Sequence, residues 1–237
     1  MSQHHTFPAG RKPLAVLAAL SAAAVLSVQA VVAGGSPAVA LPRAECDLRT
    51  GPYQEAAEDH LSLPGDGVQS ADDCEAIRQL QVRNGRTAAD GYAGVETWRI
   101  IQFERAAAQP SSLVGCGQET GVVVCVDLTR QVLWVRDGTR VLFGPVPVRS
   151  GMPGYATRTG RFAIYQRVEE QWSDLYDGPM PFSQFFSGGQ ALHGSYREIW
   201  EEPGSHGCVN LRYRDAERLW RALRVGDAVR LWGERDG

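Results

Sequence analysis

Outside residues 1–40, the 237-residue sequence has no run of basic residues and no second apolar segment of membrane-spanning length. The formal net charge is -3, and removing the two positive charges of Arg11 and Lys12 takes it to -5 for the rest of the chain. Proteins that bind nucleic acid carry a basic surface, so we expect no nucleic-acid partner. Contact with a membrane is expected only through residues 1–40. Internal repeats and low-complexity tracts are also missing from the rest of the chain.

Residues 1–40 have the pattern of an export signal. Arg11 and Lys12 precede an apolar run from about Leu14 to Ala33, and small residues such as Ala38-Val39-Ala40 follow. This is the three-part pattern of a secretory signal peptide. The apolar run also approaches the length that spans a membrane, so an uncleaved signal anchor is the alternative. The sequence therefore predicts an exported protein, in the cell envelope or secreted.

The chain has only five cysteines, an odd number, although an exported protein is free to form disulfides. Cys46 and Cys74 lie in one segment, and Cys116 and Cys125 lie close together in the next. Pairing within each couple is the simplest arrangement, and the sequence leaves other pairings open. With that pairing Cys208, in the stretch PGSHGCVN, is the free thiol.

Residues 46–107 have the pattern of three helices, one near 53–61, one after the capping residue Ser70, and one opening at Gly94. The residues expected on the buried faces of the last two are Cys74, Ile77, Leu80 or Gln81, Val95, Trp98, Ile101 and Gln102. The stretch AIRQLQVRNGRTAADGYAGVETWRIIQF resembles the peptidoglycan-binding-like three-helix domain, whose repeat has a glycine turn, Asp-Gly, and Gly-x-x-Thr opening the last helix. The alternative is a helical cap that only packs on the following domain.

After a linker at residues 108–114, residues 115–234 have the pattern of a mainly β domain with one or two helices. Strand-like runs lie at residues 132–135, 141–143, 160–166 and 190–193, and Asp137-Gly138 between the first two indicates a hairpin. An amphipathic helix is expected near residues 212–223, with Ala216, Leu219, Trp220 and Leu223 on one face, and DAVRLWG reads as the last strand.

One constellation in this domain suggests cysteine chemistry, which needs a thiolate, a base and donors for an oxyanion. His193 precedes Cys208 in the chain, and the stretch between them is long enough to form a loop that brings the two side chains together. Gly207 allows a tight turn beside the thiol, and its N–H and that of Cys208 can point at one oxygen atom. A single histidine or cysteine is more often structural than catalytic, so each signal is weak alone.

The order HGS, then SHGCVN after a loop, resembles the signature of the YkuD-type L,D-transpeptidase catalytic domain. PVRSG and TRTGRF are similar to that family's Pro-Val-Ser-Thr-Gly and Thr-Pro-Thr-Gly-x-Phe segments, and MPFSQFFSGGQALHG resembles its approach to the active site. Arg158 replaces the usual proline of the Thr-x-Thr-Gly turn, for which we expect a small effect on rigidity. Asn210, two residues after the cysteine, follows the actinobacterial variant of the motif.

This resemblance implies a YkuD-like β-sandwich and a cysteine acyltransferase of peptidoglycan biosynthesis, acting on stem peptides without a metal or another cofactor. Cys208 would be the nucleophile and His193 the base, with the carbonyl of Gly194 orienting the imidazole. The N–H groups of His206, Gly207 and Cys208 would form the oxyanion hole, while Ser205 and Asn210 brace the loop. Candidates for the substrate channel are Tyr165, Phe182, Phe186 and Ser195, whereas Phe185 is expected in the core. The three aromatic candidates are equally compatible with core positions.

Three alternatives remain at this point. Water could replace the acceptor amine, which would make the protein an L,D-carboxypeptidase-type hydrolase. His193, His206 and Cys208 could instead bind zinc, although no fourth ligand is evident. Third, the β domain could be a non-catalytic wall-binding domain, against which the complete HGS and SHGCVN motifs argue.

Overall fold

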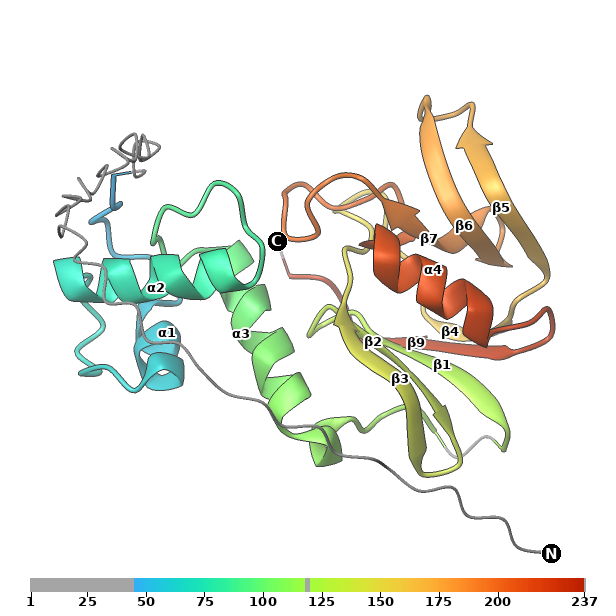
Figure 1. Cartoon of the computed structure of the whole chain (residues 1–237), viewed down its shortest axis with the longest axis horizontal. Coiled ribbons are helices and arrows are strands. Elements are labelled where there is room, and N and C mark those ends of the chain that lie inside the picture. The colour runs from blue at the N-terminus through green and yellow to red at the C-terminus, as the bar shows by residue number, and fades with distance from the viewer. Residues whose placement is uncertain (1–44, 118–119, 237) are drawn as a thin grey trace, which may run out of the picture. The chain divides into compact units, whose positions relative to one another are not determined.

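The computed structural model describes residues 45–117 and 120–236, so the expected leader, residues 1–40, lies outside the described residues. Those described include four α-helices, one short 3-10 helix and nine strands (Figure 1). The helices are α1 (Gln54–Leu61), α2 (Ala71–Arg83), α3 (Val95–Ala108), η1 (Pro110–Ser112) and α4 (Tyr213–Ala222). The strands are β1 (Val122–Asp127), β2 (Val132–Asp137), β3 (Arg140–Pro147), β4 (Gly160–Ala163), β5 (Gln166–Ser173), β6 (Gly178–Ser187), β7 (Gln190–Ser195), β8 (Val209–Arg212) and β9 (Ala228–Trp232). No helix among them is long and apolar enough to cross a membrane.

The strands form two sheets, and most neighbouring strands are antiparallel. The first sheet has the order β3-β2-β1-β9-β4 and the second the order β5-β6-β7-β8. Two pairs are parallel, β1 with β9 and β7 with β8. Parallel neighbours need a crossover connection, and the long loop from β7 to β8 supplies it for the second sheet. This loop, residues 196–208, contains the SHGC motif and is called the β7–β8 loop below.

Apolar residues from both sheets and from α4 form the main core. Strand β1 is buried on both faces, because Val124 and Val126 belong to that core while Val123 and Cys125 lie on the opposite face. Burial on both faces explains why β1 reads as a continuous apolar run and not as an alternating pattern. The expected amphipathic helix is present as α4, with Ala216 and Leu219 fully buried.

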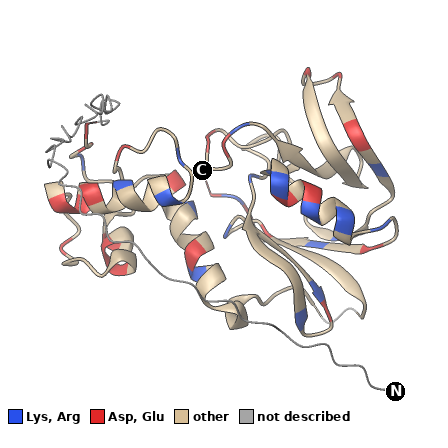
Figure 2. Cartoon of the chain, viewed as in Figure 1, with Lys and Arg blue, Asp and Glu red and all other residues tan. Residues whose placement is uncertain are grey.

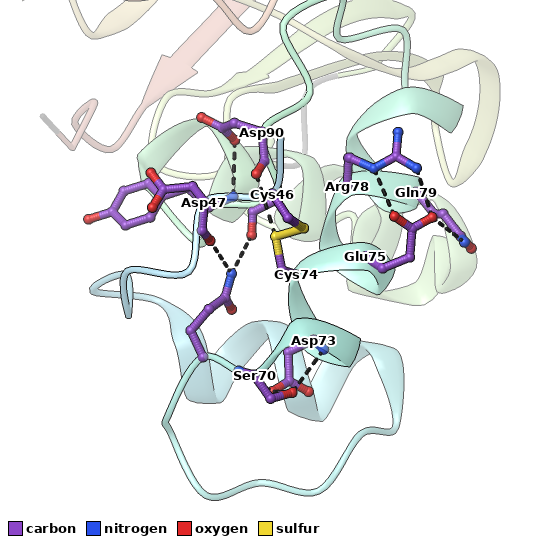
Figure 3. Close-up of a disulfide and its surroundings, with 12 residues drawn as sticks. Cys46, Asp47, Ser70, Asp73, Cys74, Glu75, Arg78, Gln79 and Asp90 are labelled. Carbon is purple, nitrogen blue, oxygen red and sulfur yellow. Dashed lines mark hydrogen bonds and ion pairs between the residues drawn. A yellow bond between two sulfur atoms is a disulfide. The ribbon is translucent and has the colours of Figure 1, made fainter. Parts of the chain in front are cut away.

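The first three helices form what we call the helical segment, residues 46–108. Helix α2 begins with a capping box, in which the side chain of Ser70 accepts from the N–H of Asp73 and the side chain of Asp73 accepts from Ser70. The disulfide Cys46–Cys74 fastens the start of the segment to α2, next to Asp90 (Figure 3). The second disulfide joins Cys116 to Cys125. Both pairings are those expected from the sequence, and Cys208 is the free cysteine of the described residues.

Helix α3 contacts two cores. Ile100 and Ile101 pack within the helical segment, whereas Ala106 packs with Trp134 and the second disulfide against the outer face of the first sheet. All of these residues belong to one compact unit. The predicted buried stripe of α3 was therefore partly wrong, since Ile101 is buried but Val95, Trp98 and Gln102 are only half-buried. The prediction assumed that α3 buries one face only, whereas α3 packs against two apolar clusters on different faces.

Acidic and basic residues are interspersed along the described chain, and α4 carries both signs (Figure 2). The β5–β6 hairpin was not predicted from hydrophobic alternation. Its first strand, QRVEEQWS, has mostly exposed or half-buried residues on both faces, so no pattern of period two marks it.

Candidate active site

The parallel pairing of β7 and β8 brings His193 and Cys208 into one site. His193 lies opposite Asn210 in the register, and Leu192 lies opposite Val209, the residue directly after Cys208. His193 and Cys208 both line a cavity of about 340 Å³. The remaining wall residues are Arg149, Ser173, Tyr176, Asp177, Gly178, Pro179, Met180, Ser195, Tyr196, Arg197, Gly204, Ser205, His206 and Asn210.

His193 is buried and its ring is held in one orientation. Its Nδ1 lies 2.8 Å from the carbonyl oxygen of Gly194. A carbonyl oxygen only accepts hydrogen bonds, so Nδ1 carries the proton and Nε2 keeps a free lone pair. Burial lowers the pKa of His193 to about 4, and the nearby charge of Arg149 acts in the same direction. The imidazole is therefore neutral at pH 7, the form that accepts a proton.

Cys208 is half-buried, and its Sγ lies 4.0 Å from the carbonyl oxygen of Gly189. Burial raises the pKa of the Cys208 thiol, while the N–H of Ala191 lowers it by a smaller amount. The thiol is therefore protonated at neutral pH. A base beside it is needed to remove the proton during attack, and His193 is that kind of group.

Side-chain oxygens fix the turn that presents the thiol. Ser205 Oγ donates to the carbonyl of Cys208 at 2.5 Å and accepts from the N–H of Gly207 at 3.1 Å. Thr157 donates to the carbonyl of Gly207 at 2.9 Å. Gly207 has φ of +111°, and a Cβ there would lie 2.5 Å from Nε2 of Gln190. Position 207 therefore requires glycine for its backbone angle, whereas the close atom is the movable end of the Gln190 side chain.

The hydrogen bond from Gly207 to Ser205 changes the expected set of oxyanion donors. Its N–H is already used, so it is not free for a substrate oxygen in this arrangement. The N–H groups of His206 and Cys208 donate to no other residue in the described part of the chain. These two are the remaining candidates for the oxyanion hole.

Of the four expected substrate-channel residues, only Ser195 lines the cavity. Phe182 and Phe186 are buried in the main core. The ring of Phe182 contacts Tyr213 and Trp220 of α4, and the ring of Phe186 contacts Phe162 of β4. Tyr165 is exposed outside the cavity and lies 6.3 Å, between ring centroids, from Phe185. Phe185 is half-buried and does not belong to the main core, contrary to its expected core position.

Several cavity residues were missed at the level of sequence. Tyr176 comes from the β5–β6 turn and stacks on the ring of His206 at 4.2 Å, while Tyr155 meets the same ring edge-on at 4.5 Å. Arg149 follows β3, far from the SHGC motif in sequence. The turn residues Asp177-Gly178 were the one local signal for the hairpin, whereas nothing local marks Arg149 as a wall residue.

The β7–β8 loop is anchored in the helical segment. Ile199 and Trp200 belong to the apolar cluster of α1–α3, and Nε1 of Trp200 donates to the carbonyl of Asn84 at 2.9 Å. The carboxylate of Glu198 accepts from the N–H and the hydroxyl of Thr87 at 3.0 and 2.7 Å. The loop that ends in Cys208 therefore contributes two side chains to the apolar core of the helical segment.

Two acidic residues of this loop are also held by arginines. Glu202 forms ion pairs with Arg99 and, at 2.8 Å, with Arg235. Glu201 pairs with Arg197 at 2.8 Å. Glu202 therefore attaches the loop to α3 and to the residues after β9, whereas the Glu201–Arg197 pair lies within the loop.

No three side chains of histidine, cysteine, aspartate or glutamate are grouped to hold a metal ion in the described ranges, 45–117 and 120–236. His206, the middle member of the zinc alternative, packs its ring between Tyr155 and Tyr176. The geometry therefore gives the zinc alternative no support.

Comparison with known proteins identifies the family of this chain. Residues 121–231 match the model of the L,D-transpeptidase catalytic domain, YkuD. A crystal structure of an L,D-transpeptidase (Yku) from Stackebrandtia nassauensis is 39% identical, with a TM-score of 0.59, and the match covers 81% of this chain and 96% of that one. An L,D-transpeptidase structure from Xylanimonas cellulosilytica is 26% identical with a TM-score of 0.46, covering 81% and 100%. A comparison with curated proteins finds no match. From its catalytic-domain match and its extended identity to the Stackebrandtia protein, the chain belongs to the L,D-transpeptidase (YkuD) family.

Proposed function

We propose that this family member, a peptidoglycan-modifying acyltransferase, uses Cys208 to form 3–3 cross-links between stem peptides of the cell wall. The donor is a tetrapeptide stem, and the attacked carbonyl lies between its third and fourth residues. The acceptor is the amine of a neighbouring stem. The site geometry supports one set of roles for this chemistry.

In the first half-reaction, Nε2 of His193 takes the proton of the Cys208 thiol as sulfur attacks the donor carbonyl. The N–H groups of His206 and Cys208 stabilise the oxyanion that forms. The intermediate collapses to a thioester when the C–N bond breaks, and His193 gives its proton to the departing amine of D-alanine. Ser205 holds the turn in which these groups lie.

In the second half-reaction, the acceptor amine attacks the thioester carbonyl and His193 removes a proton from it. The C–S bond then breaks, the new amide forms, and the thiolate of Cys208 recovers its proton from His193. The same base therefore works in both directions, which suits an imidazole whose other nitrogen is held by the Gly194 carbonyl.

The observation that supports this proposal most directly is the register of β7 and β8. It sets His193 and the SHGC turn side by side on one cavity, with a neutral imidazole and the free thiol of the described chain. The other four described cysteines are in disulfides, so they offer no competing nucleophile.

Mass spectrometry of the intact protein after incubation with a tetrapeptide stem tests the proposal. We expect an adduct equal to the donor minus D-alanine, located on Cys208 by peptide mapping. Cys208→Ala should form none, and His193→Ala should form it far more slowly. An unmodified protein with an intact tetrapeptide would contradict the proposal.

Adding an amine-bearing acceptor stem then separates transfer from hydrolysis. A cross-linked dimer supports the transpeptidase, whereas free tripeptide as the only product supports the hydrolase. Binding to isolated sacculi without either product would favour the non-catalytic alternative.

We also propose the following organisation: an export leader at 1–40, a peptidoglycan-binding-like domain at 46–107, a linker at 108–114 and the catalytic domain at 115–234. The three helices and the Cys46–Cys74 disulfide support the second of these. Cosedimentation of Cys208→Ala with sacculi tests wall binding independently of catalysis.

A further inference from the structure

Arg149 lies directly beside the catalytic pair although it comes from a distant part of the chain. Its backbone N–H donates to the carbonyl of Asn210 at 3.0 Å, and the N–H of Asn210 donates back at 3.0 Å. Asn210 in turn lies opposite His193 across β7 and β8. Arg149, Asn210 and His193 are therefore consecutive positions across the sheet, and all three residues line the cavity.

The guanidinium of Arg149 is buried without enough partners. The residue is 3% exposed, and its Nε and Nη1 have no hydrogen-bond partner among the described residues. Its nearest carboxylate is that of Glu201, 3.7 Å from Nη1, and Glu201 is already bonded to Nε of Arg197 at 2.9 Å. Burying an incompletely paired charge lowers the stability of the folded protein. Arg149 is therefore a residue that the fold accommodates at a cost in free energy.

The cavity wall around Arg149 favours anions. Arg149 and Arg197 both line it, and Asp177 is the only acidic residue in that wall. Burial lowers the pKa of Arg149 to about 10, so the group is still charged at neutral pH.

We propose that Arg149 binds the C-terminal carboxylate of the donor tetrapeptide. This inference rests on the proposed function. The carboxylate is attached to the Cα of the leaving D-alanine, which makes it the donor's nearest anion to the attacked carbonyl. A planar guanidinium matches a carboxylate with two parallel hydrogen bonds. Arg149 therefore selects donors that end at the fourth residue with a free acid.

The test compares two donors that differ only in this charge, a tetrapeptide with a free C-terminal acid and the same peptide as its C-terminal amide. The second-order rate of thioester formation on Cys208 is measured by mass spectrometry. Because a hydrogen bond to a charged group contributes more than a neutral one, wild type should prefer the acid by about 10- to 100-fold.

Arg149→Gln should lose this preference by slowing the reaction of the acid while changing that of the amide by less than about threefold. Arg149→Lys keeps the positive charge but loses the planar guanidinium that forms two parallel hydrogen bonds, so it should retain part of the preference for the acid. Arg214→Gln is the matched control, because it removes one positive charge from an exposed position on α4.

Equal slowing of both donors in Arg149→Gln would show that Arg149 only holds the β7–β8 loop, and would overturn the inference. Because wild type must itself prefer the acid, absence of that preference overturns the inference even if the variant fails to fold. A wild-type protein that reacts with neither donor would contradict the proposed function, and the inference with it.

Discussion

His193 and Cys208 line one cavity as a neutral base and a protonated thiol, because burial disfavours the charged form of both side chains. Burial lowers the pKa of the histidine and raises that of the cysteine, so a preformed thiolate–imidazolium pair is disfavoured. Proton transfer must then accompany attack on the substrate. The lowered pKa of the buried His193 consequently sets the pH below which the reaction slows.

This setting makes a prediction for the pH dependence of thioester formation. His193 accepts a proton only when neutral, and with a pKa of about 4 it remains neutral at pH 5. We expect the rate at pH 5 to stay within about twofold of that at pH 7, whereas an unperturbed histidine with a pKa of about 6.5 would give a fall of roughly 25-fold. Rapid-quench mass spectrometry from pH 4 to pH 8 measures it.

Folding must be checked in the same samples. An unfolded chain binds a proton at His193 near its usual pKa of 6.5, but the folded chain does so only near 4. The free energy of unfolding therefore falls as pH drops from 6.5 toward 4. A rate that fell steeply at pH 6 while circular dichroism stayed constant would contradict a buried neutral His193.

At the scale of elements, the β7–β8 loop has two tasks, because it carries the SHGC turn and also fills the core of α1–α3. Trp200 is 1% exposed and lies 5.9 Å, between ring centroids, from Phe103 of α3. Removing its side chain should leave a cavity in the helical segment and loosen the loop at the same time.

We therefore expect Trp200→Ala to lower the free energy of unfolding by about 3–5 kcal/mol. At temperatures where the variant is still folded, thioester formation should also slow, because the loop no longer has its anchor. Urea unfolding and the acylation assay measure the two effects. Trp172→Ala is the matched control, since Trp172 is 52% exposed on β5 and should change stability by less than about 0.5 kcal/mol. Equal stability of the two variants would exclude the anchoring role.

The elements that sequence predicted well are those with local signals. The Asp137-Gly138 hairpin, the Ser70 cap and the amphipathic α4 each depend on residues a few positions apart. The pairing of His193 with Cys208 also followed from a motif. In contrast, Arg149 and Tyr176 reach the cavity only through sheet pairing and a hairpin, and Trp200 is buried by helices from a distant part of the sequence. Local patterns contain no information about such contacts.

At the scale of the whole molecule, the helical segment and the strands share apolar surface. Without residues 45–108, Trp134, Ile199 and Trp200 would lose their cover on one side. Each large apolar side chain contributes about 1.5–3 kcal/mol on burial, and a domain has only about 5–15 kcal/mol in total. The strands are thus expected to depend on the helices.

A fragment of residues 109–237 should consequently melt at least about 10 °C below a chain that starts at Pro42, or fail to stay soluble. Differential scanning calorimetry of both proteins tests this. The longer chain is the control, because it keeps every contact of the described residues. Equal melting temperatures and equal acylation rates would indicate that the strands fold independently.

The insertion of Ile199 and Trp200 among α1–α3 also limits how such a protein can be recombined. A domain attached only by a linker can be replaced as a block, by recombination or by design. Here a replacement helical domain would need a recess for the loop, or the loop would have to be exchanged with it. A chimera of this chain therefore cannot be built by cutting it at one position between the helices and the strands. The β7–β8 loop, although it lies far along the sequence, has to be transferred together with the helices that it packs against.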